Sequence, residues 1–104
     1  MIAVTIFYPG QPDSHFDFQY YSQSHMPMIV ERMAGACRHY WIEKGLPAGA
    51  LVGAAQYCAI GHLHFESVQA FETAFFPHAT EITADVKNYT NITPILQVSE
   101  VLAD

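Results

Sequence analysis

The sequence predicts an α+β fold, in which a four-stranded antiparallel sheet carries two helical regions on one face. Three observations lead to this prediction. Strand-like and helix-like patterns alternate in the order β-α-β-β-α-β, without internal repeats and without a linker. The chain has 104 residues, a common size for one domain, so residues 1–104 are expected to form a single domain. Apolar residues make up 51% of the chain and charged residues 13%, so some apolar surface is expected to need a partner.

The first strand and the first helix are expected at residues 2–8 and 17–33. Residues 2–8 are rich in β-branched and aromatic side chains and end at a Pro-Gly pair, which is typical of a strand followed by a turn. Residues 17–33 carry apolar side chains at helical spacing, and Asp17 is the expected N-cap. Pro27 lacks an amide hydrogen, so a kink or break is expected near His25.

The second half of the chain is expected to supply three strands and one divided helix. Residues 37–46 predict the second strand, and the small residues that follow predict a flexible loop. Tyr57–Phe65 alternate as a third strand. Ser67 is the expected N-cap of the second helix, which Pro77 should split. Residues 92–102 predict the last strand, with apolar side chains sharing one face.

This order of elements suggests a ferredoxin-like sheet with both helical regions on one face, because crossover connections are right-handed. The first strand is apolar on both of its faces, so the sheet face without helices must also be hidden. A homodimer in which two sheets face each other would hide it with the fewest new features.

The charge of the chain excludes several classes of partner. The chain has ten acidic and four basic residues. The resulting net charge of -6 argues against nucleic acid and anionic membranes as partners. No apolar stretch is long enough to cross a bilayer. Two cysteines, Cys37 and Cys58, lack neighbouring bases, and no leader-like segment is recognised, so inert thiols and a cytoplasmic location are expected.

The densest group of functional side chains lies on the first helix. His25 follows Tyr21 by four residues, so both project from one helix face, and the break at Pro27 could turn the imidazole toward a cleft. Histidine suits proton transfer because its pKa lies near neutrality. We therefore take His25 and Tyr21 as candidate catalytic residues. The alternative is that both side chains are satisfied by backbone carbonyls and only shape the helix.

Other candidates carry weaker signals. His62 and His64 lie two residues apart on one strand and point the same way, but a metal needs further ligands, and no metal site or cofactor is expected. One of these imidazoles is expected to line the cleft instead. Aromatic side chains such as Tyr40 and Phe75 could form a wall for a flat ligand, although such residues also fill cores. We take Tyr40, His62 and Phe75 as candidate substrate-binding residues.

Several segments resemble the EthD family, named for ethyl tert-butyl ether degradation, nearly from end to end. They are the aromatic-Asp start of the first helix, Tyr20-Tyr21, His25-Met26-Pro27, Ala59-Ile60-Gly61-His62-Leu63, the Phe71 to His78 segment and Asn88-Tyr89-Thr90-Asn91-Ile92. The resemblance implies the dimeric α/β barrel superfamily, whose members include cofactor-free isomerases, cyclases and monooxygenases, and haem-degrading enzymes. It carries over His25 and Pro27 by position, and the fold alone does not choose among these reactions.

Two functions from different classes remain open on the sequence. The first is a cofactor-independent isomerase, cyclase or monooxygenase that converts a small apolar or aromatic molecule in a degradation or secondary-metabolite pathway, with His25 as general acid or base. The second is a non-catalytic carrier or accessory protein that delivers such a molecule to a partner oxygenase. Haem degradation is a weaker third possibility, because no proximal-ligand pattern can be recognised.

Overall fold

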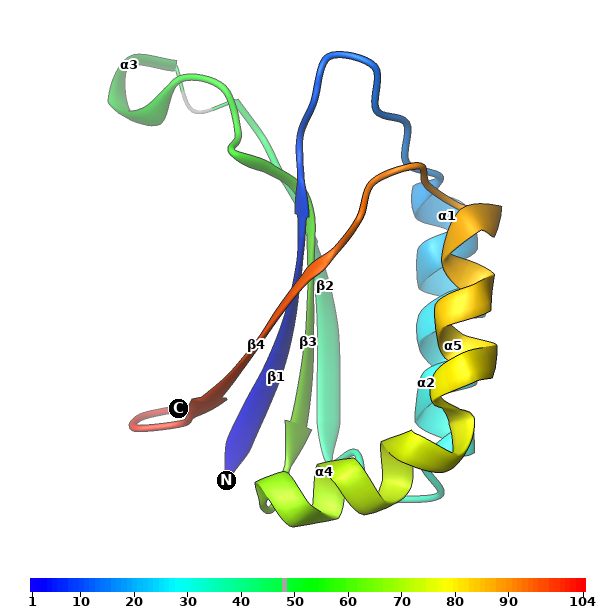
Figure 1. Ribbon diagram of the computed structural model, residues 1–104. Helices are drawn as coiled ribbons and strands as arrows, with labels where there is room; N and C mark the ends of the chain where they lie inside the picture. Colours follow the sequence, from blue (N-terminus) through cyan, green and yellow to red (C-terminus); the bar gives the residue numbers. More distant parts are fainter. Residues whose placement is uncertain (48) are drawn as a thin grey trace.

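The computed structural model describes residues 1–47 and 49–104, and its centre is a four-stranded antiparallel sheet (Figure 1). The strands are β1 (Ile2–Pro9), β2 (His39–Lys44), β3 (Tyr57–Phe65) and β4 (Ile95–Glu100). They are ordered β2-β3-β1-β4, so the N-terminal strand is central. The α+β, ferredoxin-like fold predicted from the sequence is confirmed.

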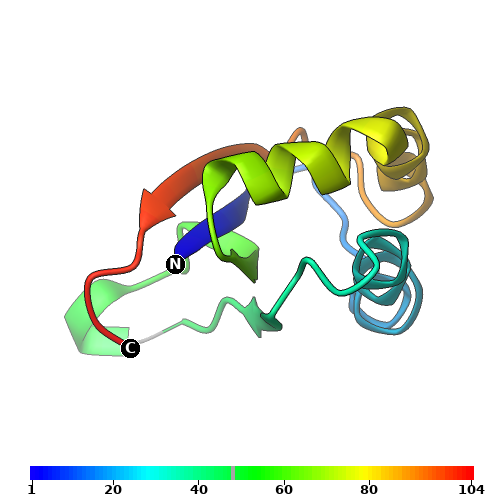
Figure 2. The same cartoon turned by 90° about the horizontal axis from the view of Figure 1, so that it is seen from below.

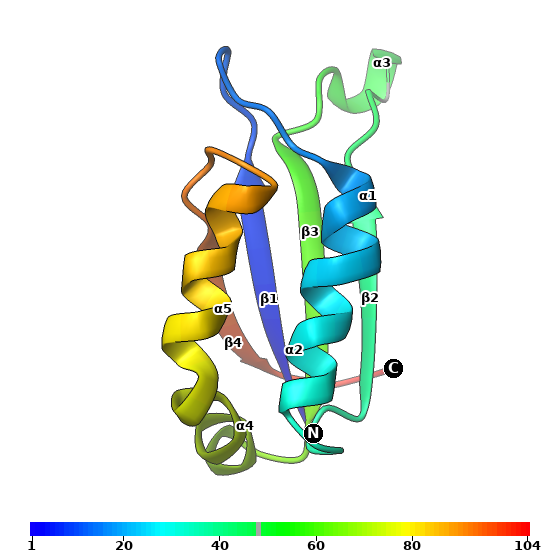
Figure 3. The ribbon, with the colours of Figure 1, turned by 90° about the vertical axis from the view of Figure 1, so that its right-hand side faces the viewer.

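The helices cover one face of this sheet. In chain order they are α1 (Phe18–Tyr20), a π-helical segment (Tyr21–His25), α2 (Met26–Arg32), α3 (Gly49–Val52), α4 (Val68–Phe75), a 3-10 turn (Phe76–His78), α5 (Ala79–Asp85) and a second 3-10 turn (Val86–Asn88). Figures 1 and 3 show α2 and α5 side by side over the same face. On the opposite side Figures 1 and 2 show only the short helix α3, and no helix packs on that face of the sheet. Helix α3 is short and lies beyond the end of the sheet (Figure 1).

The first helical region begins at the predicted cap and contains the predicted break. The Asp17 side chain accepts a hydrogen bond from the Tyr20 amide, which satisfies one of the free donors at the helix start. The break takes the form of a π-helical segment, in which the Met26 amide donates to the Tyr21 carbonyl five residues earlier. The wider turn ends at His25, two residues before Pro27, which cannot donate to any helical carbonyl.

The strand register decides which side chains reach the helices. Val4 and Tyr8 on β1 and Leu63 on β3 are at most 2% exposed and form the core under the helices. His62 on β3 pairs with Thr5 on β1 and with Trp41 on β2. Because neighbouring residues in a strand point to opposite faces, His62 lies on the face that carries no helix.

The second helical region bends at Pro77, as predicted. The Ser67 hydroxyl caps α4 by accepting from the Ala70 amide. A 3-10 turn containing Pro77 separates α4 from α5, and Figure 1 shows the two helices running in different directions. The bend lets α4 close one end of the structure while α5 runs beside α2 over the sheet.

Two boundaries differ from the sequence predictions. The last strand begins at Ile95 rather than residue 92, because Pro94 cannot donate to the ladder and Ile92 is buried before the strand starts. It also ends at Glu100, and Leu102 is left 87% exposed. The expected flexible loop contains helix α3, and Ala48 within that loop lies outside the described residues.

The cysteines remain separate in the fold. Cys37 and Cys58 are both free thiols, and burial raises the pKa of each above its ordinary value. A raised pKa favours the protonated thiol, which is the less nucleophilic form. None of the helices in the described part of the chain is long and apolar enough to cross a membrane.

Candidate functional site

A cavity of about 590 Å³ lies between the sheet and the helices. Apolar side chains from three strands and from α2, α4 and α5 form most of its wall: Val4, Ile6, Ile29, Met33, Leu63, Phe71, Phe75, Ile82, Val86, Ile92, Pro94 and Leu96. Polar side chains contribute the rest: Tyr8, His25, Thr83, Lys87, Thr90, Asn91 and Thr93. A volume and lining of this kind are typical of sites for small organic ligands.

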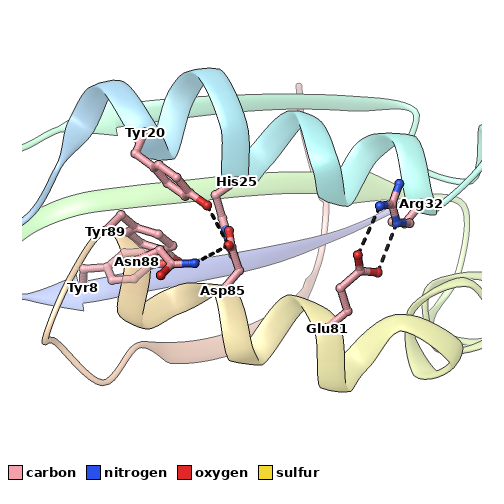
Figure 4. A network of polar contacts seen from close by, with 8 residues as sticks. All are labelled: Tyr8, Tyr20, His25, Arg32, Glu81, Asp85, Asn88 and Tyr89. Atoms are coloured by element: carbon pink, nitrogen blue, oxygen red, sulfur yellow. Dashed lines mark hydrogen bonds and ion pairs between the residues drawn. The ribbon is translucent and has the colours of Figure 1, made fainter.

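Two polar links hold α2 and α5 side by side above this cavity (Figure 4). At one end the guanidinium of Arg32 donates from Nε and Nη2 to the two carboxylate oxygens of Glu81, each at 3.1 Å. At the other end the ring of His25 meets the carboxylate of Asp85, with 2.8 Å between Nδ1 and Oδ2. The second link brings a titratable pair to the wall of the cavity.

The position of His25 follows from the π-helical segment that it ends. Its side chain is 3% exposed, and its imidazole lines the cavity. With Nδ1 donating to Asp85, the neutral ring carries its free lone pair on Nε2. Nε2 makes no hydrogen bond to any residue of the described ranges, so it is the ring atom left for a ligand.

Asp85 is held by three donors from two sides. Besides His25, it accepts a hydrogen bond from the Tyr20 hydroxyl at 2.7 Å and one from the Asn88 side-chain amide at 2.9 Å, both at Oδ1. Burial raises the pKa of Asp85, but these donors outweigh it and hold the pKa below its ordinary value. Asp85 is therefore an ionised carboxylate that fixes the orientation of the His25 ring.

The pKa of His25 itself is lowered. Burial lowers it, and the hydrogen bond to Asp85 acts in the opposite direction without reversing the shift. At neutral pH the ring is uncharged and can accept a proton at Nε2. A proton accepted there would be stabilised by the carboxylate on the far side of the ring, which is how a general base is supported.

A group of tyrosines surrounds the histidine. The hydroxyls of Tyr8 and Tyr89 are hydrogen-bonded at 2.7 Å, and the Tyr89 ring lies 4.5 Å from the His25 ring, measured between centroids. The rings of Tyr21 and His25 are stacked with their centroids 5.7 Å apart, so the two side chains share a helix face as expected. However, Tyr21 is fully buried in the core and is not among the cavity-lining residues. Tyr8, which the sequence did not single out, lines the cavity instead.

The predicted substrate-binding residues divide between the cavity and other places. Phe75 lines the cavity. Tyr40 faces the helix side of β2, opposite Leu63, but it does not reach the lining. His62 lies on the other face of the sheet. Its ring is stacked on Trp41, with 4.3 Å between the ring centroids, and its Nε2 is 3.1 Å from Oε1 of Glu43, within hydrogen-bond distance. The expectation that a strand imidazole lines the cleft is wrong, because alternation places both strand histidines on the face without helices.

Sequence reasoning missed Asp85 and Tyr8 for different reasons. Asp85 is 60 residues from His25 in the chain, and no local spacing connects them. Tyr8 looked like an ordinary strand residue. Its strand is apolar on both faces, so alternation alone could not show which face the helices cover. Within residues 1–47 and 49–104, no group of three or more His, Cys, Asp or Glu side chains is arranged to hold a metal ion.

Comparison with family models finds no match, and neither does comparison with curated proteins. Solved structures do match. A dimeric ferredoxin-like protein from an uncultured marine organism, 9% identical, shares the fold with a TM-score of 0.63 over 100% of this chain and 97% of that one. An EthD family protein from Bacillus halodurans C-125 is 14% identical and has a TM-score of 0.73 over 98% of this chain and 99% of its own.

An EthD-like protein from Ralstonia eutropha JMP134 is much more similar. It is 38% identical in sequence, and the match covers 99% of this chain and 93% of that protein with a TM-score of 0.92. Identity at this level over nearly the whole chain reflects common descent as well as a common fold. The chain belongs to the EthD family.

Proposed function

We propose that this protein is an enzyme that moves a proton on a small apolar or aromatic molecule, as an isomerase or a cyclase does, with His25 as the general base. One observation carries the proposal: a neutral histidine, oriented by an ionised carboxylate, lies in the wall of a mostly apolar cavity. The sequence left a monooxygenase equally open, but the His25–Asp85 pair has the geometry of acid–base chemistry.

The cavity accounts for binding. Its wall is mostly aliphatic and aromatic, so a ligand of matching shape gains affinity by removing apolar surface from water. Most of the polar lining side chains are uncharged, and among the described lining residues Lys87 is the single lysine or arginine. This composition favours a carbon skeleton with one or two oxygen atoms over a multiply charged substrate.

The histidine accounts for chemistry. Nε2 of His25 takes a proton from a carbon or hydroxyl of the bound molecule, and the imidazolium that forms is stabilised by Asp85. The same ring then returns the proton to a different atom of the substrate. A positioned acid–base group of this kind contributes about 10²–10⁴-fold to a rate.

The test is hydrogen–deuterium exchange at carbon, followed by proton NMR in deuterated water. The probes are 2-tetralone, 2-indanone and α-angelica lactone, each incubated with wild type, His25→Ala and His15→Ala. His15 is an exposed histidine that does not line the cavity, and its hydrogen bonds to Thr90 and Asn91 use backbone atoms that alanine keeps, so His15→Ala is the matched control. The proposal expects exchange above background with wild type and the control, and background exchange with His25→Ala.

The carrier function is the alternative outcome of the same test. It expects saturable binding of these probes, detected by native mass spectrometry, with no exchange above background in any variant. Exchange that survives His25→Ala at the wild-type rate would refute the role of His25 even if the protein is an enzyme.

We further infer that the protein forms a homodimer through the helix-free face of the sheet. Phe7, Ile60 and Trp41 lie on this face by register, and all three are partly exposed in one protomer. A solved neighbour with this fold is dimeric. A second copy of the same face offers a matching apolar surface, as two-fold interfaces require.

The dimer is tested by sedimentation velocity of wild type and Ile60→Asp. Each protomer of a two-fold dimer would bury one aspartate at the interface, so the dimer contains two unpaired charges. The dimer dissociation constant should therefore rise by roughly 100-fold or more. Leu51→Asp, at an 88% exposed position on α3, is the control and should leave the constant unchanged. A wild type that sediments as a monomer would refute the inference.

A further inference from the structure

Tyr8 is a polar residue of the cavity wall, and the proposed role of His25 does not use its hydroxyl. Tyr8 lies on the central strand β1 and is 1% exposed. Its hydroxyl is 2.7 Å from the hydroxyl of Tyr89, which does not belong to the cavity lining. The cavity wall therefore includes one tyrosine of a hydrogen-bonded pair, and the second tyrosine is not part of the wall.

Counting hydrogens shows what this pair can offer a ligand. Two hydroxyls carry two hydrogens, and one hydrogen forms the bond between them. Tyr89 makes no other hydrogen bond through its hydroxyl to a residue that the structure describes. The buried hydroxyl of Tyr21 lies close enough to act on the pKa of Tyr8, and as a second donor to Tyr8 it would occupy the other lone pair of that oxygen. When Tyr89 donates to Tyr8, the hydrogen of Tyr8 is free to bond an acceptor in the cavity. The opposite direction would leave the hydrogen of Tyr89 buried without an acceptor, which is costly.

Tyr8 and His25 border the same space from different elements. Tyr8 comes from the sheet, and His25 comes from the π-helical segment above it. The Tyr89 ring lies beside both, with ring centroids 6.0 Å from Tyr8 and 4.5 Å from His25. Burial raises the pKa of Tyr8 well above its ordinary value, so its hydroxyl keeps its hydrogen wherever His25 is neutral.

We propose that Tyr8 donates a hydrogen bond to a substrate oxygen on which negative charge develops as His25 removes a proton, and that Tyr89 is the positioning residue that aims it. This inference rests on the proposed function. It names the substrate class as an enolisable carbonyl compound: a ketone, lactone or related molecule with a hydrogen on the carbon beside the carbonyl.

The step balances without any further reactant. Nε2 of His25 takes the proton from the α-carbon, and the electrons of that C–H bond form a carbon–carbon double bond. The carbonyl π electrons move to oxygen, giving an enolate that accepts the Tyr8 hydrogen bond. The imidazolium then returns the proton to the α-carbon, which gives exchange, or to a conjugated γ-carbon, which gives an isomer.

The first test compares exchange of 2-tetralone by wild type, Tyr8→Phe, Tyr89→Phe and Tyr57→Phe. Loss of a hydrogen-bond donor to a developing oxyanion should slow Tyr8→Phe by about 10²–10³-fold in kcat with a small change in KM. Tyr89→Phe should slow kcat by less, roughly tenfold, because Tyr8 keeps its hydroxyl but loses its orientation. Tyr57→Phe removes a hydroxyl from a tyrosine on β3 that does not line the cavity, and it should match wild type.

The second test needs no turnover. Substituted 2-naphthols of increasing acidity imitate an enolate, and their binding is measured by isothermal titration calorimetry. Wild type should bind the more acidic naphthols more tightly, and Tyr8→Phe should lose most of this dependence, with affinity for the most acidic one falling about 10-fold or more. Far-ultraviolet circular dichroism and thermal melting check that each Phe variant is folded.

The outcomes separate this inference from the function on which it rests. If His25→Ala abolishes exchange while Tyr8→Phe matches wild type in both tests, the role of Tyr8 is refuted and the general base stands. If His25→Ala keeps wild-type exchange, the proposed function is refuted. Naphthol affinities that rise equally with acidity in wild type and Tyr8→Phe would overturn the role of Tyr8 in either case.

Discussion

Replacing Asp85 by Asn tests how the His25 ring is oriented without changing the shape of the site. In wild type the carboxylate accepts three hydrogen bonds, at 2.8 Å from His25, 2.7 Å from Tyr20 and 2.9 Å from Asn88. An amide in the same place can donate as well as accept. A donating amide would bond the lone pair of Nδ1 and move the ring proton to Nε2, the atom that should act as base.

The size of the effect follows from what is lost. A ring protonated at Nε2 cannot accept the substrate proton, and the imidazolium loses its stabilising charge. The corresponding Asp-to-Asn change in a Ser-His-Asp triad lowers kcat by about 10⁴ for the same reason. Because general-base catalysis itself contributes about 10²–10⁴, exchange of 2-tetralone by Asp85→Asn should fall by roughly 10³-fold.

The assay combines the exchange rate with nitrogen-15 NMR of the His25 ring, which reports the protonated nitrogen. Wild type should carry its proton on Nδ1, and Asp85→Asn should carry it on Nε2. Asn88→Ala is the control, since it removes one donor to Asp85 but keeps the carboxylate and the His25 contact; its rate should stay within a few fold of wild type. An Asp85→Asn protein that keeps both the tautomer and the wild-type rate would refute this reasoning.

Two further predictions concern pH and packing. Burial lowers the pKa of His25, so the pH at which the exchange rate falls to half should lie below 6.5; a midpoint above 6.5 would contradict the structure. As pH falls, His25 becomes protonated in the unfolded chain at a higher pH than in the folded protein. The free energy of unfolding should therefore decrease as pH falls below about 6.5, and His25→Gln should make this dependence on pH weaker. In Gly61→Ala the new methyl group would collide with the Tyr21 hydroxyl, which costs about 1–3 kcal/mol in urea denaturation. The cost should shrink in a Tyr21→Phe background, where the ring carbon lies 3.5 Å away, and equal costs in both backgrounds would exclude this contact.

Much of the fold was predictable because the signals that define it are local. Asp17 and Ser67 cap their helices as their positions suggested, and both helical regions break where a proline removes a donor. The last strand was predicted too long because apolar periodicity continues through Ile92. Burial of Ile92 under the helices produces the same pattern as a strand, and only pairing with β1 separates them.

The candidate site was predictable only in part. His25 was found because a titratable side chain beside a helix break is a local feature. Its neighbour Tyr21 shares its helix face but is buried in the core, where its hydroxyl has no hydrogen-bond partner among the described residues. His62 was assigned to the cleft although the sheet places it on the other face, since helical coverage of a face cannot be read from alternation alone.

By itself the sequence determined the order of the elements, the helix caps, the proline breaks and the presence of a histidine beside one of them. These depend on interactions within a few residues of the chain. Only the tertiary structure decided that Asp85 orients His25 and that Tyr8, rather than Tyr21, reaches the cavity. Both outcomes depend on how α5 and β1 pack against the first helical region, and contacts between segments far apart in the chain leave no local pattern in the sequence.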